Sequence, residues 1–487
     1  MRNNFYTFRD PSGTVFFDGG NVYRAIYAEG IEDYWTFCAS KAYAQLVEAG
    51  SIVSARKALP DKSPSFELSN FAEEPIEFAV HERIEFPSYP YEWSPGMLKQ
   101  AGFLTLDIAE TLLNEGFGLK DASPLNILFR WSKPIFVDFL SIERRSLTDA
   151  LWLAKAQFDR TFILPLIASK HFGLGLGQIF IPYRDGLKPA WVRQRCGFGK
   201  ALSRDFFFPV TLPALLDKKS ETHIVDQIIH EDNAQRKERF ARLYRPDVSK
   251  FIMQKTFGDL RNQLQRLSAD GKRRDSNWTE YEDTLGYGLQ QVESKKKFVQ
   301  RVLDKSLPKR ILDVGCNTGL YSELCARSGS KVVAIDGDVA VVDRLNQTAL
   351  TKGLDILSLN INFARPSPAI GWENGENLSF IERAEGFFDG VLLLAVIHHL
   401  ILTERIPLRA ILALCGRITK NFLIIEFIGN RDPMFRLLSR HNEHLYANFN
   451  RQFFEEECLK QFNILQCEEI VGTDRCLYHL EKRHELV

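Results

Sequence analysis

The sequence has little of what would mark a metal site, an exported protein or a membrane protein. Its eight cysteines form no C-x-x-C pair and no Cys/His cluster with metal-ligand spacing. The N-terminus lacks a basic segment followed by an apolar one, so we expect no signal peptide. The longest apolar run, residues 391–402, contains two histidines and is too short to span a bilayer. These absences predict a cytoplasmic protein with reduced thiols and no transmembrane segment.

An excess of charge of one sign is also lacking. The 62 basic and 62 acidic residues give a formal net charge of zero, so the composition favours neither nucleic acid nor an anionic membrane as a partner. Two short basic runs, residues 272–274 and 295–297, have acids nearby and are interpreted as solvated helix faces. We therefore expect no nucleic-acid partner, and the sequence does not indicate an oligomeric state.

At 487 residues the chain is too long for one ordinary hydrophobic core. Residues 1–217 mix strand-like and helix-like segments, and residues 218–300 are charged with apolar residues at helical spacing. The segment 269–276 is the best linker candidate. We predict an α+β domain over residues 1–217, a charged helical linker and lead-in over 218–300, and an α/β domain over 301–487.

Local patterns in the first 120 residues predict individual elements. Residues 14–17 and 21–26 flank Asp-Gly-Gly and predict a hairpin. A helix is predicted over 33–49 and a strand over 83–86. Apolar residues at intervals of three and four predict a further helix over 95–118.

The most informative stretch is ILDVGCNTG at 311–319, followed by VVAID at 332–336. One apolar run leads through Asp313 and Gly315 to Gly319 and a helical segment, and the second apolar run ends at Asp336. This order predicts a βαβ unit that binds an adenosine-containing ligand. The glycines let the backbone approach the ligand, and Asp336 can accept hydrogen bonds from both ribose hydroxyls.

The spacing of this stretch argues against a dinucleotide. Asp-x-Gly-x-x-x-Gly stands in place of G-x-G-x-x-G, and Asp313 would repel a pyrophosphate. The same carboxylate could pair with the ammonium group of S-adenosylmethionine, which carries no phosphate. We therefore predict S-adenosylmethionine as cofactor, bound by residues at the ends of the first three strands: Asp313, Gly315, Cys316, Asn317, Gly319, Asp336 and Asn362.

Polar residues at the next two strand ends are the candidates for chemistry. His398 and His399 follow the fourth predicted strand, and Glu426 lies in the fifth. Methyl transfer mainly requires a positioned nucleophile, and a nearby histidine can take its proton. We predict His398, His399 and Glu426 as catalytic residues. The alternative is that one histidine packs and the other caps the following helix.

Residues 311–319 with Asp336 resemble motif I and the second-strand acid of class I S-adenosylmethionine-dependent methyltransferases. The resemblance implies a doubly wound, Rossmann-like sheet of seven strands with a terminal antiparallel hairpin. YPYEW at 89–93, LKDASP at 119–124, PSP at 366–368 and IHHL at 397–400 resemble a two-part bacterial family similar to nodulation-specificity methyltransferases. We expect methyl transfer to an unidentified small-molecule or glycan-type acceptor.

The N-terminal region resembles kinase-like phosphotransferases. Asp121 and Asn126 are spaced as in a kinase catalytic loop, and a predicted strand ends at Asp138. The resemblance implies that Asp121 is the base and that Asn126 and Asp138 hold Mg²⁺ for ATP. The chain departs from the family at Lys120 and Leu140 and lacks a G-x-G-x-x-G loop, so we predict a degenerate kinase-like domain.

Two alternatives to a simple methyltransferase stay open at this point. One is a bifunctional enzyme whose N-terminal domain is an ATP- and Mg-dependent phosphotransferase. The other is a noncatalytic scaffold that binds the methyl donor.

Overall fold

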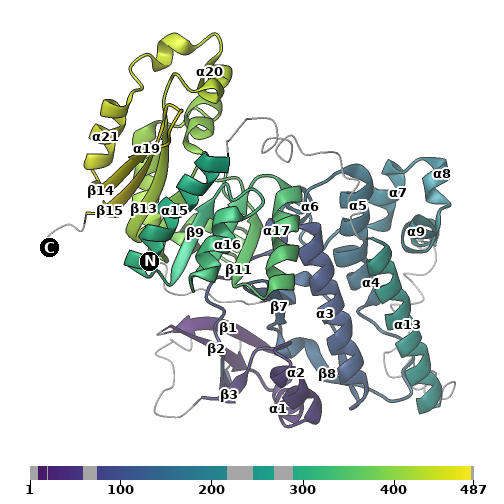
Figure 1. Cartoon of the computed structure of the whole chain (residues 1–487). Coiled ribbons are helices and arrows are strands. Elements are labelled where there is room, and N and C mark those ends of the chain that lie inside the picture. Colours follow the sequence, from purple (N-terminus) through teal and green to yellow (C-terminus); the bar gives the residue numbers. More distant parts are fainter. Residues whose placement is uncertain (1–8, 19, 59–73, 217–244, 268–288, 484–487) are drawn as a thin grey trace. The chain divides into compact units, whose positions relative to one another are not determined.

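The computed structural model describes residues 9–18, 20–58, 74–216, 245–267 and 289–483 (Figure 1). The chain divides into two compact units. The first comprises Met1–Arg130 and Pro134–Asp270, and the second comprises Trp131–Lys133 and Gly271–Val487. The linker predicted at 269–276 lies outside the described residues.

The first unit begins with an antiparallel sheet of four strands in the order β1-β2-β4-β3. The strands are β1 (Gly13–Asp18), β2 (Asn21–Ile26), β3 (Ala55–Lys57) and β4 (Glu77–His81). The predicted hairpin is confirmed, because β1 pairs with β2 from Gly13 to Asp18. The strand predicted at 83–86 is wrong. The strand lies at β4 instead, where the alternate residues Phe78 and Val80 pack with Phe16.

Helices make up most of the rest of the first unit. The longest before residue 217 is α3 (Pro95–Leu113), which begins after Ser94, whose hydroxyl accepts the Met97 N–H. The helix predicted over 33–49 is two helices, because the Ser40 side chain caps a new helix through the Tyr43 N–H. The other helical segments are α1 (Ile31–Cys38), α2 (Lys41–Glu48), α4 (Lys155–Phe158), η6 (Asp159–Ile163), α5 (Leu164–Phe172), α6 (Leu176–Phe180), α7 (Pro189–Arg195), α8 (Phe198–Ala201), α9 (Arg204–Phe206), η7 (Phe207–Thr211) and α13 (Pro246–Arg266).

Part of the predicted linker packs within this unit. Helix α13 lies against α3, and its Arg261 forms ion pairs with Asp107 at 2.7 Å and Glu110 at 3.1 Å. Leu264 is fully buried, and a Cβ at Gly102 of α3 would lie 3.0 Å from its Cδ1. Residues 246–266 therefore belong to the first unit.

Two small strand pairs follow α3. Strand β5 (Phe117–Leu119) pairs with β8 (Ile142–Arg144), and β6 (Ile127–Arg130) pairs with β7 (Lys133–Phe136). Two short 3₁₀ turns connect them, η4 (Pro124–Asn126) and η5 (Phe139–Ser141). A third, η3 (Pro90–Glu92), precedes α3. The loops around η4 and η5 carry the residues that resemble a kinase site.

The second unit is built on a seven-stranded sheet in the order β11-β10-β9-β12-β13-β15-β14. The first five of these positions are parallel neighbours, and β15 is antiparallel to both β13 and β14. This confirms the predicted doubly wound sheet with a terminal hairpin. The strands are β9 (Arg310–Val314), β10 (Lys331–Asp336), β11 (Ile356–Asn360), β12 (Phe388–Leu393), β13 (Thr419–Ile428), β14 (Phe462–Glu469) and β15 (Arg475–Lys482).

Helices connect these strands and cover the sheet (Figure 1). They are α15 (Leu289–Ser306), α16 (Leu320–Arg327), α17 (Val339–Lys352), η8 (Trp372–Asn374), α18 (Phe380–Ala384), η9 (His399–Thr403), α19 (Leu408–Ile418), α20 (Pro433–Ser439), η10 (Glu443–Tyr446) and α21 (Arg451–Leu459). Phe298 and Val302 of the lead-in helix α15 join Ile311 and Leu392 in the core. The central strands are near-continuous apolar runs, as expected for a sheet covered on both faces.

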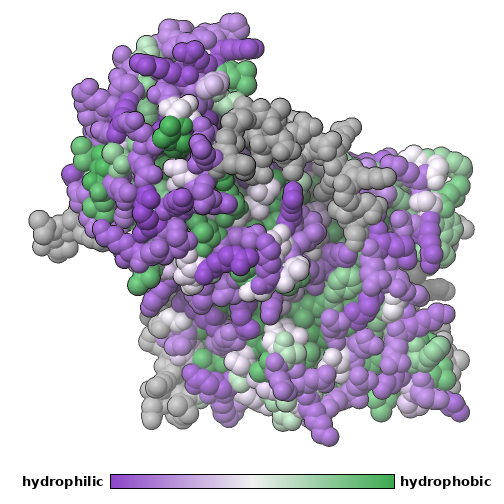
Figure 2. Space-filling model, in the orientation of Figure 1, coloured by the Kyte–Doolittle hydropathy of each residue, from purple (hydrophilic) through white to green (hydrophobic). Residues whose placement is uncertain are grey.

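The face of the molecule seen in Figure 2 is covered largely by hydrophilic residues, with hydrophobic ones scattered between them. Isolated exposed apolar residues are ordinary on protein surfaces and need no special explanation. Among the described residues, none of the helices combines the length and the apolar content needed to cross a bilayer.

Candidate functional site

A cavity of about 1580 Å³ opens at the carboxyl ends of the parallel strands in the second unit. Its walls come from the ends of β9, β10, β11 and β12 and from α15, α16, α17 and η9. The strand order reverses between β9 and β12, since β10 and β11 lie on one side and β13 on the other. Ligands of doubly wound sheets bind at this kind of reversal.

Most of the predicted cofactor residues come together in this cavity. Its lining includes Asp313, Gly315, Cys316, Asn317, Asp336 and Asn362. Gly319 is the exception. It precedes α16 with φ 90°, and a Cβ there would stand 2.2 Å from Leu345 Cδ1. Gly319 therefore shapes the turn and the packing of α17 against it, rather than lining the cavity.

The loop after β9 is tied closely to its neighbours. Gly315 has φ 69°, and a Cβ at this position would lie 2.5 Å from Val396 Cγ2. The N–H groups of Gly315 and Cys316 both donate to the Ile335 carbonyl, at 2.8 and 3.1 Å. The loop is thus held against β10 and beneath Val396, with room only for glycine.

Asp336 joins the two loops that enclose the ligand position. Its carboxylate accepts the backbone N–H of Asn317 at 3.0 Å and of Asp338 at 2.9 Å. Burial raises the pKa of Asp336 above its ordinary value. Asn317 adopts φ 47°, and its Oδ1 is buried with no hydrogen-bond partner among the described residues. An orphaned acceptor in a cavity wall is a position for a ligand donor.

Asp313 is the second carboxylate of the wall. It is 2% exposed and accepts the Ser322 hydroxyl at 2.6 Å. Burial raises the pKa of Asp313 to about 6. A cation placed beside this carboxylate would stabilise its ionised form.

These residues fit S-adenosylmethionine and do not fit a phosphate-bearing cofactor. The Gly315 position provides the close backbone approach, and Asn317 provides an unused acceptor. Asp313 and Asp336 place two carboxylates where a pyrophosphate would be repelled. The side-chain oxygen of Asn362 accepts the Ala364 N–H at 2.9 Å, and this hydrogen bond fixes the side chain at the β11 end of the cavity.

The two histidines occupy different positions. His399 lines the cavity, whereas His398 is 1% exposed and is not among the lining residues. Their ring centroids are 4.1 Å apart. Burial lowers the pKa of His399, and burial together with His399 and Lys295 lowers the pKa of His398 to about 2. Neither ring nitrogen of His398 has a hydrogen-bond partner in the part of the chain that the structure describes.

The backbone around the histidines is unusual. Ala395, which lines the cavity between β12 and His398, has φ 55°. His399 then begins a π-helical turn. Strained non-glycine residues and π-turns cluster at functional sites. The connection between β12 and η9 therefore holds His399 at the cavity wall through a backbone conformation that is energetically unfavourable for a non-glycine residue.

Glu426 does not face the cavity. It is fully buried, is not among the lining residues, and accepts hydrogen bonds from Lys295 at 2.8 Å and Arg475 at 3.3 Å. Lys295 does line the cavity and is only 4% exposed. The interpretation of residues 295–297 as a solvated face is therefore wrong at Lys295. Its spacing from Val292 and Phe298 placed it on the apolar face of α15, and that signal was present in the sequence.

The residues predicted for an N-terminal site also lie close together. Arg24 donates to Asp138 at 3.0 Å across 114 positions of the chain, and Ser141 donates to the other oxygen of Asp138. The Asn126 amide donates to Ser141 at 2.9 Å. Burial and the charge of Asp138 raise the pKa of Asp121. No group of three or more His, Cys, Asp or Glu residues suited to a metal occurs within the described ranges.

Several known proteins are similar to this chain. Residues 287–456 match the family model of a methyltransferase domain. The nodulation protein NoeA of Rhizobium meliloti (strain 1021) is 27% identical over 478 residues, which covers 98% of this chain and 95% of that protein. N-methyltransferase NodS from Bradyrhizobium japonicum WM9 matches with 13% identity and a TM-score of 0.31, covering 40% of this chain and 98% of that one. Magnesium protoporphyrin IX methyltransferase (ChlM) from Synechocystis PCC 6803 matches with 19% identity and a TM-score of 0.28, covering 43% and 86%.

The family match lies on the segment that forms the cavity, from α15 through the parallel strands to α21. The second unit therefore carries a methyltransferase domain, and the protein is an S-adenosylmethionine-dependent methyltransferase.

Proposed function

We propose that the second unit transfers a methyl group to a small-molecule or glycan-type acceptor, with the reacting atoms beside His399. The observation that carries this is one continuous cavity that joins Asp336, Asp313 and His399. Pockets for a single small ligand have volumes of roughly 300–1,000 Å³, and this cavity of about 1580 Å³ leaves room for donor and acceptor together. Similarity to a nodulation protein over 98% of the chain supports a role that involves both units.

The residues at the strand ends would hold the donor from its adenosine to its amino-acid end. Asn362 would meet the adenine, Asp336 the ribose hydroxyls, and Asp313 the ammonium group. When bound, S-adenosylmethionine supplies a methyl group already activated on a sulfonium centre. The task of the protein is then to align the acceptor atom and to take its proton where it has one.

His399 is the group best placed to take that proton. Because burial lowers its pKa, the imidazole is neutral at physiological pH and has a nitrogen that can accept. The ring of His398 contacts that of His399 at a tilt of 47°, and His398 would act by positioning the ring of His399. Glu426, held by Lys295 and Arg475, would likewise act through a neighbour and not on the acceptor.

The test combines an acceptor search with a pair of variants. Cell extract is incubated with the protein and methyl-labelled donor, and mass spectrometry identifies the labelled product. His399→Ala should bind S-adenosylhomocysteine as the wild type does and lose roughly 10²–10⁴-fold in turnover. The exposed His441 provides the control substitution His441→Ala. Equal turnover in His399→Ala and wild type would remove His399 from the mechanism, and absence of any labelled product would favour the noncatalytic scaffold.

A second candidate function belongs to the first unit. The Arg24–Asp138 ion pair, with Asn126 and Asp121 beside it, supports a kinase-like phosphotransferase site that binds ATP and Mg²⁺. Calorimetry should then detect Mg²⁺-dependent ATP binding that is lost in Asp138→Asn. The exposed Asp185 supplies a matched control, Asp185→Asn. No ATP binding with or without Mg²⁺ would exclude this candidate.

A further inference from the structure

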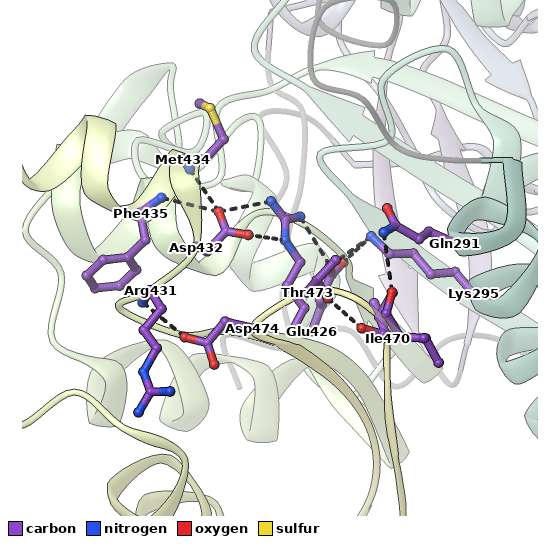
Figure 3. A network of polar contacts seen from close by, with 12 residues as sticks. Gln291, Lys295, Glu426, Arg431, Asp432, Met434, Phe435, Ile470, Thr473 and Asp474 are labelled. Atoms are coloured by element: carbon purple, nitrogen blue, oxygen red, sulfur yellow. Dashed lines mark hydrogen bonds and ion pairs between the residues drawn. The ribbon is translucent and has the colours of Figure 1, made fainter.

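A chain of four buried charges runs from the cavity wall to the start of α20 (Figure 3). Lys295 Nζ lies 2.7 and 2.8 Å from the two carboxylate oxygens of Glu426. Arg475 donates to Glu426 at 3.3 Å and to the oxygens of Asp432 at 2.6 and 3.1 Å. Asp432 in turn accepts the N–H of Met434 and so caps α20.

The burial of these groups calls for a role beyond stability. None of the four side chains belongs to a residue more than 8% exposed, and two cations face two carboxylates. Removing ions from water costs several kcal/mol each, so apolar replacements of buried ion networks are often as stable. Lys295 is the one member of the network that also lines the cavity. The other three members fix the place of its ammonium group.

The order of the strand ends indicates what that ammonium group faces. Across the sheet, Asn362 follows β11, Asp336 ends β10, Asp313 lies in β9, and Lys295 is bound to Glu426 of β13. A donor whose adenosine lies over β11 and β10 extends its amino-acid end past β9 toward β12 and β13. That end carries one ammonium and one carboxylate group.

The charges of the wall complement this zwitterion. Asp313 offers a carboxylate near β9, and Lys295 offers an ammonium near β13. The other basic residues of the described cavity wall, Arg344 and Lys352, lie on α17, which follows β10 and leads to β11. They are exposed, whereas Lys295 is buried. A charge-assisted contact in a buried position is roughly twice as strong as a neutral one.

We propose that Lys295, positioned by Glu426, binds the carboxylate group of the methyl donor. The proposal rests on the proposed function, because it takes the cavity as the donor site. An anionic group on the acceptor has the same chemistry, and the experiment below separates the two sources.

The experiment compares two ligands that differ by the carboxylate. S-adenosylmethionine and decarboxylated S-adenosylmethionine are titrated calorimetrically into the wild type, Lys295→Met and Lys297→Met. Lys297 lies on the same helix but is exposed, so its substitution is the control. The wild type and Lys297→Met should prefer the carboxylate-bearing ligand by roughly ten- to a hundredfold. Lys295→Met should lose this preference and bind the decarboxylated ligand as the wild type does.

Binding of the decarboxylated ligand also reports that Lys295→Met is folded. Should that variant not fold, Glu426→Gln keeps the lysine and loosens its position, and it should reduce the preference for the carboxylate in part. Equal weakening of both ligands would assign Lys295 a structural role and overturn the proposal. If Lys295→Met binds the donor as the wild type does but turns over more slowly, Lys295 binds an anionic group of the acceptor. That result would also overturn the proposal. Failure of the wild type to bind either ligand would overturn the proposed function itself.

Discussion

Asp313 and Asp336 occupy similar places at the ends of adjacent strands, but their carboxylates are held in different ways. Asp336 accepts two backbone N–H groups and organises the loops after β9 and β10. Asp313 is buried and is held by Ser322, whose hydroxyl donates to it. The carboxylate of Asp336 therefore joins two loops, whereas that of Asp313 is held by one residue of α16.

This difference predicts a pH dependence of donor binding. Burial raises the pKa of Asp313 to about 6. Above that pH the carboxylate is ionised and can pair with the cationic end of the donor; below it the carboxyl is neutral and the pairing is lost. The Kd for S-adenosylmethionine should rise by up to roughly tenfold per pH unit below the pKa. Asp313→Asn, which can still accept the Ser322 hydroxyl, should bind weakly at every pH, and a wild-type slope in this variant would contradict the assignment.

The elements around the ligand position explain why glycine is required there. Gly315 and Gly353 both have positive φ, 69° and 63°. A Cβ at Gly315 would meet Val396, whereas a Cβ at Gly353, after α17, would meet nothing within 4 Å. Substituting Gly353 therefore tests backbone strain alone, whereas substituting Gly315 adds a steric clash with Val396.

Alanine substitutions at these two glycines should therefore differ. Gly353→Ala should cost about 1–2 kcal/mol of unfolding free energy from backbone strain and leave donor affinity unchanged. Gly315→Ala should cost more, because Val396 must move, and it should weaken donor binding as the loop shifts. Chemical denaturation and calorimetry measure both quantities. Equal effects of the two substitutions would show that the packing of Val396 on the loop does not matter.

Much of the second unit could be predicted from sequence because its signals are local. Asp313, Gly315 and Asp336 mark strand ends that any βαβ unit places side by side, and the parallel order follows. The spacing of Lys295 from Val292 and Phe298 indicated that its side chain is buried. Its ion pair with Glu426 could not be predicted, because the two residues are 131 positions apart. The distinct roles of His398 and His399 were likewise beyond reach, since they depend on the positive φ of Ala395 and the π-turn that follows.

In the first unit, local sequence patterns predicted the positions of strands and of the domain boundary less well. The apolar residues at 83–86 resembled a strand, but the pairing with β2 selects β4 at Glu77–His81. The charged composition of residues 246–266 suggested a linker, yet Leu264 and Phe257 are buried within the unit. Tertiary packing determines both the position of β4 and the unit to which residues 246–266 belong, and composition alone does not predict that packing.

At the scale of the whole molecule, the chain has two compact units with separate candidate sites. Ligands should therefore protect separate parts of the chain. Saturating S-adenosylhomocysteine, at about one hundred times Kd, should stabilise the unit that binds it by about 2.7 kcal/mol. Hydrogen exchange should slow in peptides covering the β9–α16 loop and η9.

Peptides from α3 in the first unit serve as the internal reference and should exchange at unchanged rates. Equal protection throughout both units would contradict a donor site confined to the second unit.

We propose that the cavity at the strand ends binds the methyl donor and that His399 lies at the reacting centre. The most direct test is calorimetric titration of S-adenosylhomocysteine into the wild type, Asp336→Asn and His399→Ala. We expect one binding site in the wild type, roughly tenfold or greater weakening in Asp336→Asn, and unchanged affinity in His399→Ala. Affinity in Asp336→Asn equal to that of the wild type would contradict this proposal.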